Sequence, residues 1–259
     1  MTPRDYHAAW KAYADRKPLS FFLHIVKGAA TANKNWKRCK DKTTNSELCA
    51  LIKEFEGYVA NGQDAPQAKQ KLFIETAYVF WLLGDKEPQF ADILQNRISQ
   101  SFVGTTYYEA GHPGFRQFEY ELHTMCRLVE EGFGFEDIEG NKEPDLLVKS
   151  DTGDFLLEVK MPTSNMSGAI KKALGQILGK RSEGAIVVGL DHILGDDSGG
   201  ETSLEDLCGE AYEQVKDKAI VCYLEFSEHS SEGAPGCILA GPSAPAHIRE
   251  VIEKALTGD

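Results

Sequence analysis

Apolar residues recur at helical spacing through residues 46–102, and this pattern predicts a helical region. Capping and breaking residues mark helices over residues 46–62, 65–84 and 88–102. The middle segment carries an aromatic stripe that is interpreted as core, made of Phe73, Tyr78, Phe80 and Trp81. The Gly-rich segment 104–114 is typical of a linker. We therefore predict an all-α N-terminal domain over residues 1–105 and a second domain over residues 106–259.

Beyond the linker, one long helix is expected and then short apolar runs bounded by turn residues. The helix runs from Pro113 to Gly132, and its apolar stripe comprises Phe115, Phe118, Leu122, Met125 and Val129. Runs typical of strands follow at residues 133–138, 146–148, 155–159 and 185–190, with a helix over 167–181 before the last of them. A helix, two strands and a closing helix are then expected over residues 203–218, 219–226, 236–241 and 246–256. This order predicts an α/β domain with a mixed central sheet flanked by helices.

The two middle runs carry the most informative charges, in the sequence PDLLVKSDTGDFLLEVK. The turn residues between them predict a β-hairpin, in which Glu158 and Lys160 share a face and Asp145 meets Glu158 across the strands. Two carboxylates and an ammonium in one place are able to hold a divalent cation and activate water. The alternative is an ordinary ion-paired surface. Against that alternative, Glu158 lies within an apolar strand, where a carboxylate needs compensation.

These residues and their element order resemble the PD-(D/E)XK nuclease superfamily, which has the restriction-endonuclease-like fold. The resemblance covers residues 110–190 and is closest in pattern to the archaeal Holliday junction resolvases. The matching positions are Glu121 on the long helix, Pro144-Asp145, Glu158-Val159-Lys160, and Gln176 on the following helix.

The resemblance implies a role for each matching residue. Asp145, Glu158 and Glu121 would ligate Mg²⁺ or Mn²⁺, and Lys160 would orient or deprotonate the attacking water. Gln176 would contact a ligand or the substrate, although a plain surface amide is an equal alternative. Glu119 replaces Glu121 if the helix register differs by one turn. A homodimer is a further expectation, since many enzymes of this fold act as dimers.

The net charge of −12 opposes nucleic-acid binding, but the charge is unevenly distributed. Residues 16–42 hold eight Lys and Arg against one acid, a net of +7. Residues 160–181 carry a net of +5, whereas residues 182–259 carry −12. The basic segments predict a substrate face that includes Lys37, Arg38, Lys171 and Lys172.

Composition adds bounds on the class of protein. Hydrophobic residues make up 42% and charged residues 26%, as in an ordinary globular protein, and no apolar run is long enough to cross a membrane. The six cysteines form no CxxC pair, so neither a zinc site nor a disulfide framework is indicated, and a cytoplasmic location is expected. We predict a metal-dependent nuclease acting on DNA in preference to RNA. The alternatives are an inactive nuclease fold that binds nucleic acid or a protein, and an acidic interaction protein whose hairpin charges are coincidental.

Overall fold

The computed structural model describes residues 6–34, 36, 47–103, 115–138, 144–162, 165–190, 203–225 and 236–257. The chain forms two compact units. We call residues 5–126 the helical unit and residues 127–259 the sheet unit. The division falls within a helix rather than in the predicted linker at residues 104–114, which lies outside the described residues.

The described part of the helical unit is built from helices. They are α1 (Tyr6–Ala14), α2 (Leu19–Ala32), α4 (Glu47–Asn61), α5 (Gln67–Phe80), the π-helix η1 (Trp81–Lys86), the 3-10 helix η2 (Pro88–Phe90), α6 (Ala91–Val103) and the larger part of α7 (Phe115–Glu130). The predicted helices over residues 46–62 and 88–102 are confirmed, whereas the predicted helix 65–84 is α-helical only to Phe80. Of its aromatic stripe, Phe73, Tyr78 and Phe80 are buried, as expected, while Trp81 is half-buried.

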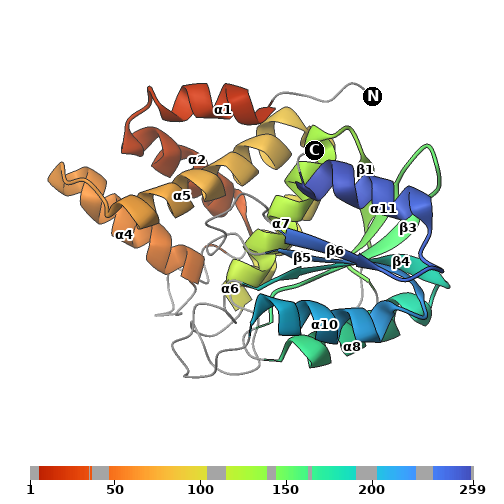
Figure 1. Cartoon of the computed structure of the whole chain (residues 1–259). Coiled ribbons are helices and arrows are strands. Elements are labelled where there is room, and N and C mark those ends of the chain that lie inside the picture. The colour runs from red at the N-terminus through yellow and green to blue at the C-terminus, as the bar shows by residue number, and fades with distance from the viewer. Residues whose placement is uncertain are drawn as a thin grey trace. The chain divides into compact units, whose positions relative to one another are not determined.

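The described part of the sheet unit contains one mixed sheet of six strands in the order β1-β2-β3-β4-β5-β6 (Figure 1). The strands are β1 (Gly134–Asp137), β2 (Leu146–Lys149), β3 (Phe155–Lys160), β4 (Glu183–Gly189), β5 (Ala219–Glu225) and β6 (Gly236–Ala240). Strands β3, β4 and β5 are parallel, and the other neighbouring pairs are antiparallel. The α/β class and the mixed central sheet are therefore confirmed.

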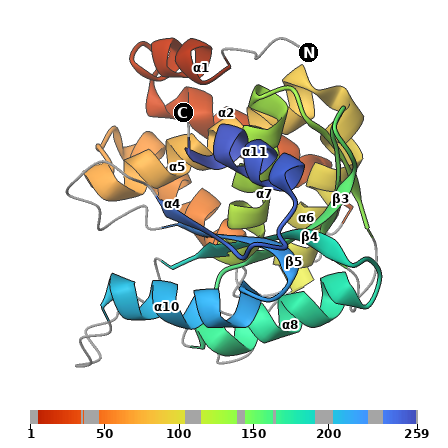
Figure 2. The same cartoon turned by 45° about the vertical axis from the view of Figure 1, so that its right-hand side comes forward.

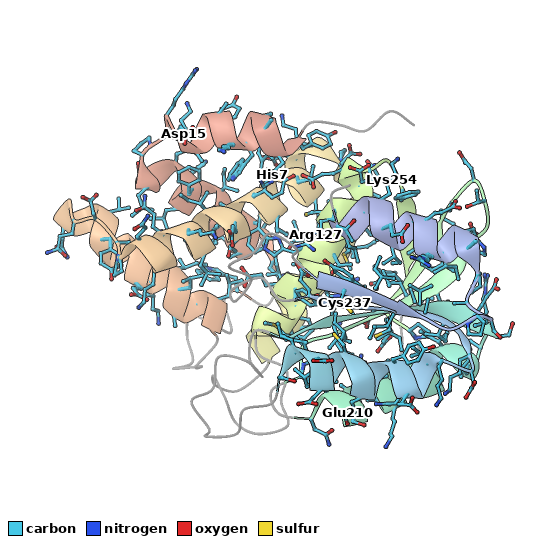
Figure 3. The ribbon with its side chains drawn as sticks, viewed as in Figure 1. His7, Asp15, Arg127, Glu210, Cys237 and Lys254 are labelled. Atoms are coloured by element: carbon cyan, nitrogen blue, oxygen red, sulfur yellow. The ribbon has the colours of Figure 1, made fainter. Side chains whose placement is uncertain are left out.

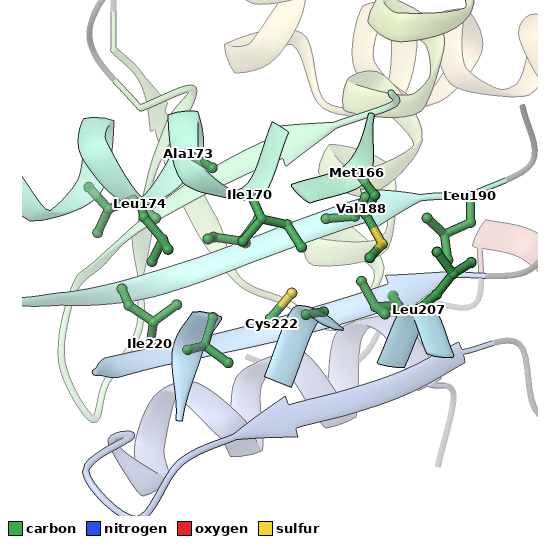
Figure 4. Close-up of a cluster of buried hydrophobic side chains, with 14 of the residues drawn as sticks. Met166, Ile170, Ala173, Leu174, Val188, Leu190, Leu207, Ile220 and Cys222 are labelled. Atoms are coloured by element: carbon green, nitrogen blue, oxygen red, sulfur yellow. The ribbon is translucent and has the colours of Figure 1, made fainter. Parts of the chain in front are cut away.

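Two crossover helices cover one face of this sheet, and a third helix packs on the other face. Helix α8 (Met166–Leu178) connects β3 to β4, and α10 (Leu204–Val215) connects β4 to β5 on the same side (Figure 2). Figure 4 shows the apolar core beneath them, with Ile170 and Leu207 facing Val188 and Cys222. On the other face, α11 (Ala246–Ile252) contacts β4 and β5 and continues as a π-helix, η3 (Glu253–Thr257).

Local sequence explains three helix boundaries in the sheet unit. Ser203 caps α10, accepting a hydrogen bond from the Asp206 backbone at 3.1 Å. The start of α8 differs from the predicted one, because Asn165 rather than Ser167 is the cap and accepts from the Gly168 backbone at 2.7 Å. Gly132 ends α7 in the left-handed region, with φ of 81°.

Candidate functional site

Asp145 and Glu158 lie directly opposite each other on neighbouring strands. The register that pairs Leu146 with Leu157 extends by one residue to this pair. The Asp145 backbone nitrogen donates to Glu158 Oε2 at 2.9 Å, and the Val159 backbone nitrogen donates to Asp145 Oδ2 at 2.8 Å. Each carboxylate is thus fixed by a main-chain amide of the other strand, as the hairpin prediction required.

Glu158 is the most unusual ionisable group of the site. Its side chain is fully buried in the middle of β3, next to Ile186 of β4 in the register of the sheet. The pKa of the Glu158 carboxyl is raised from 4.5 to about 7, chiefly by burial and next by the nearby Asp145 carboxylate, while Lys160 opposes the rise. Perturbed carboxyls of this kind are concentrated at functional sites.

Lys160 supplies the opposing cation. It follows Glu158 by two residues and therefore projects from the same face of β3, where its Nζ forms an ion pair with Glu158 Oε1. The Lys160 side chain is 17% exposed, so its ammonium lies between the buried carboxylate and the surface. The structure thus brings together three of the predicted site residues: Asp145, Glu158 and Lys160.

The turn between β2 and β3 carries two polar contacts of its own. Lys149 Nζ bonds Asp154 Oδ2 at 2.9 Å, and Arg181 donates to the Asp154 carbonyl at 2.7 Å. Gly153 has φ of 140°, and a Cβ there would lie 3.3 Å from His247 Nε2 on α11. The close approach and the positive φ together require glycine at this position.

Glu119 and Glu121 of α7 belong to the helical unit, and each is buried with a partner there. Arg97 of α6 pairs with Glu121 through Nε and Oε2 at 2.9 Å. Thr76 of α5 donates to Glu119 Oε1 at 2.7 Å. That Glu121 binds a metal, or that Glu119 does so in its place, remains a prediction.

The predicted substrate-binding residues are distributed over two segments. Gln176 is half-buried on α8, and Lys171 and Lys172 are exposed on the same helix. Lys37 and Arg38 lie outside the described residues. A role in substrate binding stays a prediction for all of them.

A divalent cation fits the chemistry of this site in part. Asp145 and Glu158 offer carboxylate oxygens, the ligands that Mg²⁺ and Mn²⁺ prefer. The Asp145 carboxylate also raises the pKa of Glu158, because the two negative charges repel each other. A bound cation would relieve that repulsion. Among the residues that the structure describes, no group of three or more His, Cys, Asp and Glu residues gathers as a metal site. The protein would therefore supply two carboxylates here, with other ligands from backbone or water.

Two arginine pairs were missed by the sequence reasoning. Besides Arg97 with Glu121, Arg127 of α7 (labelled in Figure 3) pairs with the buried Glu225 at the end of β5. Glu225 carried a detectable signal, because it stands inside an apolar strand in the same way as Glu158. Its partner was not predictable, since nearly a hundred residues separate the two in the chain.

Cysteine chemistry differs in one respect from the prediction of no disulfides. Cys49 is engaged in a disulfide, whereas Cys126, Cys208, Cys222 and Cys237 are not disulfide-bonded. The Sγ atoms of Cys208 and Cys237 lie 3.4 Å apart, between α10 and β6.

No protein-family model matches the chain, and no curated protein and no solved structure matches it significantly. Within the described residues, no helix is both long and apolar enough to cross a membrane.

Proposed function

We propose that this protein hydrolyses nucleic-acid phosphodiesters with a divalent cation held by Asp145 and Glu158. The observation that carries the proposal is the buried carboxylate of Glu158, hydrogen-bonded across the hairpin to Asp145 and ion-paired to Lys160. An ordinary surface ion pair would be exposed on both sides, and its ammonium would lower the pKa of its carboxyl, as Lys149 does for Asp154 in the same hairpin. Glu158 differs on both counts, and this favours a site over a solvated face.

The architecture around the motif supports the restriction-endonuclease-like fold as the finer interpretation. Helix α7 precedes a three-stranded antiparallel segment, β1 to β3, and α8 then crosses to the parallel strand β4. The PD-(D/E)XK superfamily, which the sequence resembles, places its motif in this order of elements. The motif also lies toward the carboxyl end of β3. Ligand-binding sites commonly lie at the carboxyl ends of parallel strands.

The residues of the chain would divide the chemistry as follows. A bound Mg²⁺ or Mn²⁺ would supply Lewis acidity and an activated water. Asp145 and Glu158 would bind the cation, and their main-chain hydrogen bonds keep them in place without reorganisation. Lys160, whose side chain is 17% exposed, would orient the attacking water and offset charge that builds on the phosphoryl oxygens.

A second candidate is a nuclease-like fold that binds nucleic acid or a protein without cutting. The ion pair of Lys160 with Glu158 favours it, because this ammonium compensates the buried carboxylate in the absence of any metal. The described residues also offer only two neighbouring carboxylates rather than a larger ligand group. The net charge of −12 points the same way.

The test is cleavage of single-stranded, duplex and branched DNA and of RNA, at low salt with Mg²⁺ or Mn²⁺. Wild type is compared with Asp145→Asn and Lys160→Ala. The matched controls are Asp154→Asn and Lys149→Ala, since Asp154 and Lys149 form an exposed carboxylate–ammonium pair in the same hairpin. Metal-dependent cutting that both site variants lose and both controls keep supports the proposal. No cutting of any substrate, or equal cutting by all variants, overturns it, and Mn²⁺ binding without cutting supports the second candidate.

A further inference from the structure

The helical unit carries a group of aromatic rings at its surface. We define the aromatic surface as Tyr13 of α1, Phe21 of α2 and Trp81 of η1, with Lys17 and Lys86 beside them. Tyr13 is 46% exposed, more than any other large hydrophobic side chain recorded as exposed among the described residues. The rings of Tyr13 and Phe21 are nearly parallel, at 3° with centroids 6.2 Å apart. Lys17 Nζ lies over both rings, 5.7 and 5.2 Å from their centroids.

Trp81 extends the surface from a different element. Its ring is half-buried, with its centroid 6.5 Å from that of Tyr13 and 5.3 Å from that of the buried Trp10. Lys86 Nζ lies 5.2 Å from the Trp81 centroid. Trp81 and Lys86 are the two ends of the π-helix η1, a distorted turn of a kind that frequently occurs at functional sites.

The two lysines have no acidic partner among the described residues. Within the described residues, no carboxylate lies within 4.0 Å of the ammonium of Lys17 or Lys86, although Asp15 and Asp85 are close in sequence. By contrast, Lys254 lies over the Phe133 ring in the sheet unit and also pairs with Glu131 (labelled Lys254, Figure 3). Among the described residues, no carboxylate therefore neutralises the ammonium of Lys17 or Lys86, and both charges can interact with a bound anion.

We infer that the aromatic surface binds single-stranded nucleic acid, with bases stacked on Tyr13 and Trp81 and phosphates contacted by Lys17 and Lys86. Flat rings with adjacent cations are the usual means by which proteins bind unpaired strands, because each base offers a π-face and each phosphate a charge. The neighbouring sequence agrees, since residues 16–42 carry a net charge of +7. The inference adds a binding surface to the proposed nuclease, and it does not depend on cleavage.

Strandedness follows from the same geometry. Bases within a duplex are stacked on one another and present only their edges and the backbone. Tyr13 and Trp81 would then find no free base face, and only the charge of the two lysines would act. An acidic protein segment would also use the charge but not the stacking. The aromatic rings therefore distinguish a single strand from both alternatives.

The experiment measures fluorescence anisotropy of a labelled 20-nucleotide oligothymidylate in EDTA, where no metal-dependent cleavage occurs, using the full chain. Tyr13→Ala should weaken binding by about fivefold or more and Tyr13→Phe should not, since stacking is worth roughly this much per base. Lys17→Gln should weaken binding and lower its salt dependence. The matched controls are Tyr212→Ala, an exposed tyrosine of α10, and Lys254→Ala, and both should bind as wild type does.

Three results would overturn the inference: no binding of the oligonucleotide by wild type, equal binding by Tyr13→Ala, or equal competition by duplex DNA or polyglutamate of matched charge. Equal competition would mean that the aromatic surface recognises negative charge and not unpaired bases. Unfolding temperatures of all variants guard against loss of structure, and Tyr13→Phe keeps the test valid if the alanine variant is unstable. Binding without any cleavage in the metal-dependent assay would retain this inference and reject only the nuclease.

Discussion

Asp145 and Glu158 hold each other in place through main-chain amides of opposite strands. The amide of Asp145 donates to Glu158 Oε2 at 2.9 Å, and the amide that follows Glu158 donates to Asp145 Oδ2 at 2.8 Å. Two carboxylates are thereby kept close although they repel each other, and the pKa of Glu158 is raised to about 7, chiefly by burial and next by the Asp145 carboxylate. A fixed pair of this kind suits cation binding better than two flexible surface acids would.

Stability should depend on pH through Glu158. Because its pKa is 4.5 when unfolded and about 7 when folded, the folded state binds the proton more tightly. The resulting stability is fully present below pH 4.5 and is lost as the pH rises through about 7. Relative to Glu158→Gln, wild type should lose about 3 kcal/mol between pH 4.5 and 8. Urea unfolding of both proteins across this range is the measurement, and parallel curves would contradict the assignment.

Lys160 should matter more to stability than Lys149, although both pair with a hairpin carboxylate. Lys160→Met leaves a buried carboxylate without its ammonium and should cost about 2–3 kcal/mol at pH 8, and less at pH 5 where Glu158 is protonated. Lys149→Met breaks a pair whose side chains are 38% and 36% exposed, and should cost much less stability because solvent screens the pair. Chemical denaturation at both pH values checks this, and equal losses would show that Glu158 is more solvated than its burial indicates.

Breaking the buried pair of Arg97 and Glu121 should destabilise the helical unit. Each side chain is 8% exposed, so Glu121→Gln leaves a guanidinium charge poorly compensated and should cost about 3 kcal/mol. Arg97→Met in the same chain should recover part of this loss. Calorimetric Mn²⁺ titration of Glu121→Gln then tests the predicted metal role, and the same titration of Glu119→Gln tests the alternative ligand. Weaker binding in the first alone supports Glu121 as a ligand, and unchanged affinity assigns Glu121 to structure.

Gly153 should tolerate substitution far less than Gly175. At Gly153 a Cβ would require a left-handed backbone and would lie 3.3 Å from His247 Nε2, so Gly153→Ala should cost about 1–3 kcal/mol. At Gly175, within α8, a Cβ meets nothing within 4 Å, so Gly175→Ala should stabilise by about 0.5–1 kcal/mol. Thermal unfolding of both variants measures these two changes in stability. A neutral Gly153→Ala would mean that the turn relaxes easily around His247.

Cys208 and Cys237 should be cross-linked by mild oxidation. Their Sγ atoms lie 3.4 Å apart at the packing of α10 on β6, whereas Cys126 and Cys222 are buried. Diamide treatment followed by peptide mapping should yield one new disulfide. Burial and the neighbouring Cys208 raise the pKa of the Cys237 thiol to about 12, so the reaction should be slow at neutral pH. Cys208→Ser is the control that should abolish the cross-link, and a different pairing would contradict the geometry.

The sequence alone predicted the elements of the sheet unit and the hairpin that unites Asp145, Glu158 and Lys160. Its signals there are local: apolar runs of strand length, a turn rich in Ser, Asp and Gly, and the alternation of side chains along β3. Alternation placed Glu158 and Lys160 on one face, and the short turn placed Asp145 opposite Glu158. The resemblance to PD-(D/E)XK nucleases then supplied roles, which the proposed experiments test.

Only the tertiary structure determined the contacts between residues far apart in the chain. Arg97 with Glu121, Arg127 with Glu225, and Cys208 with Cys237 depend on how helices pack and on strand order, which no local pattern contains. The extent of burial at Glu158 is of the same kind, because it depends on β4, which pairs with β3 only in the folded sheet. Local sequence fixes periodicity and turns through backbone sterics and side-chain direction, whereas desolvation and pairing of charges are properties of the assembled core.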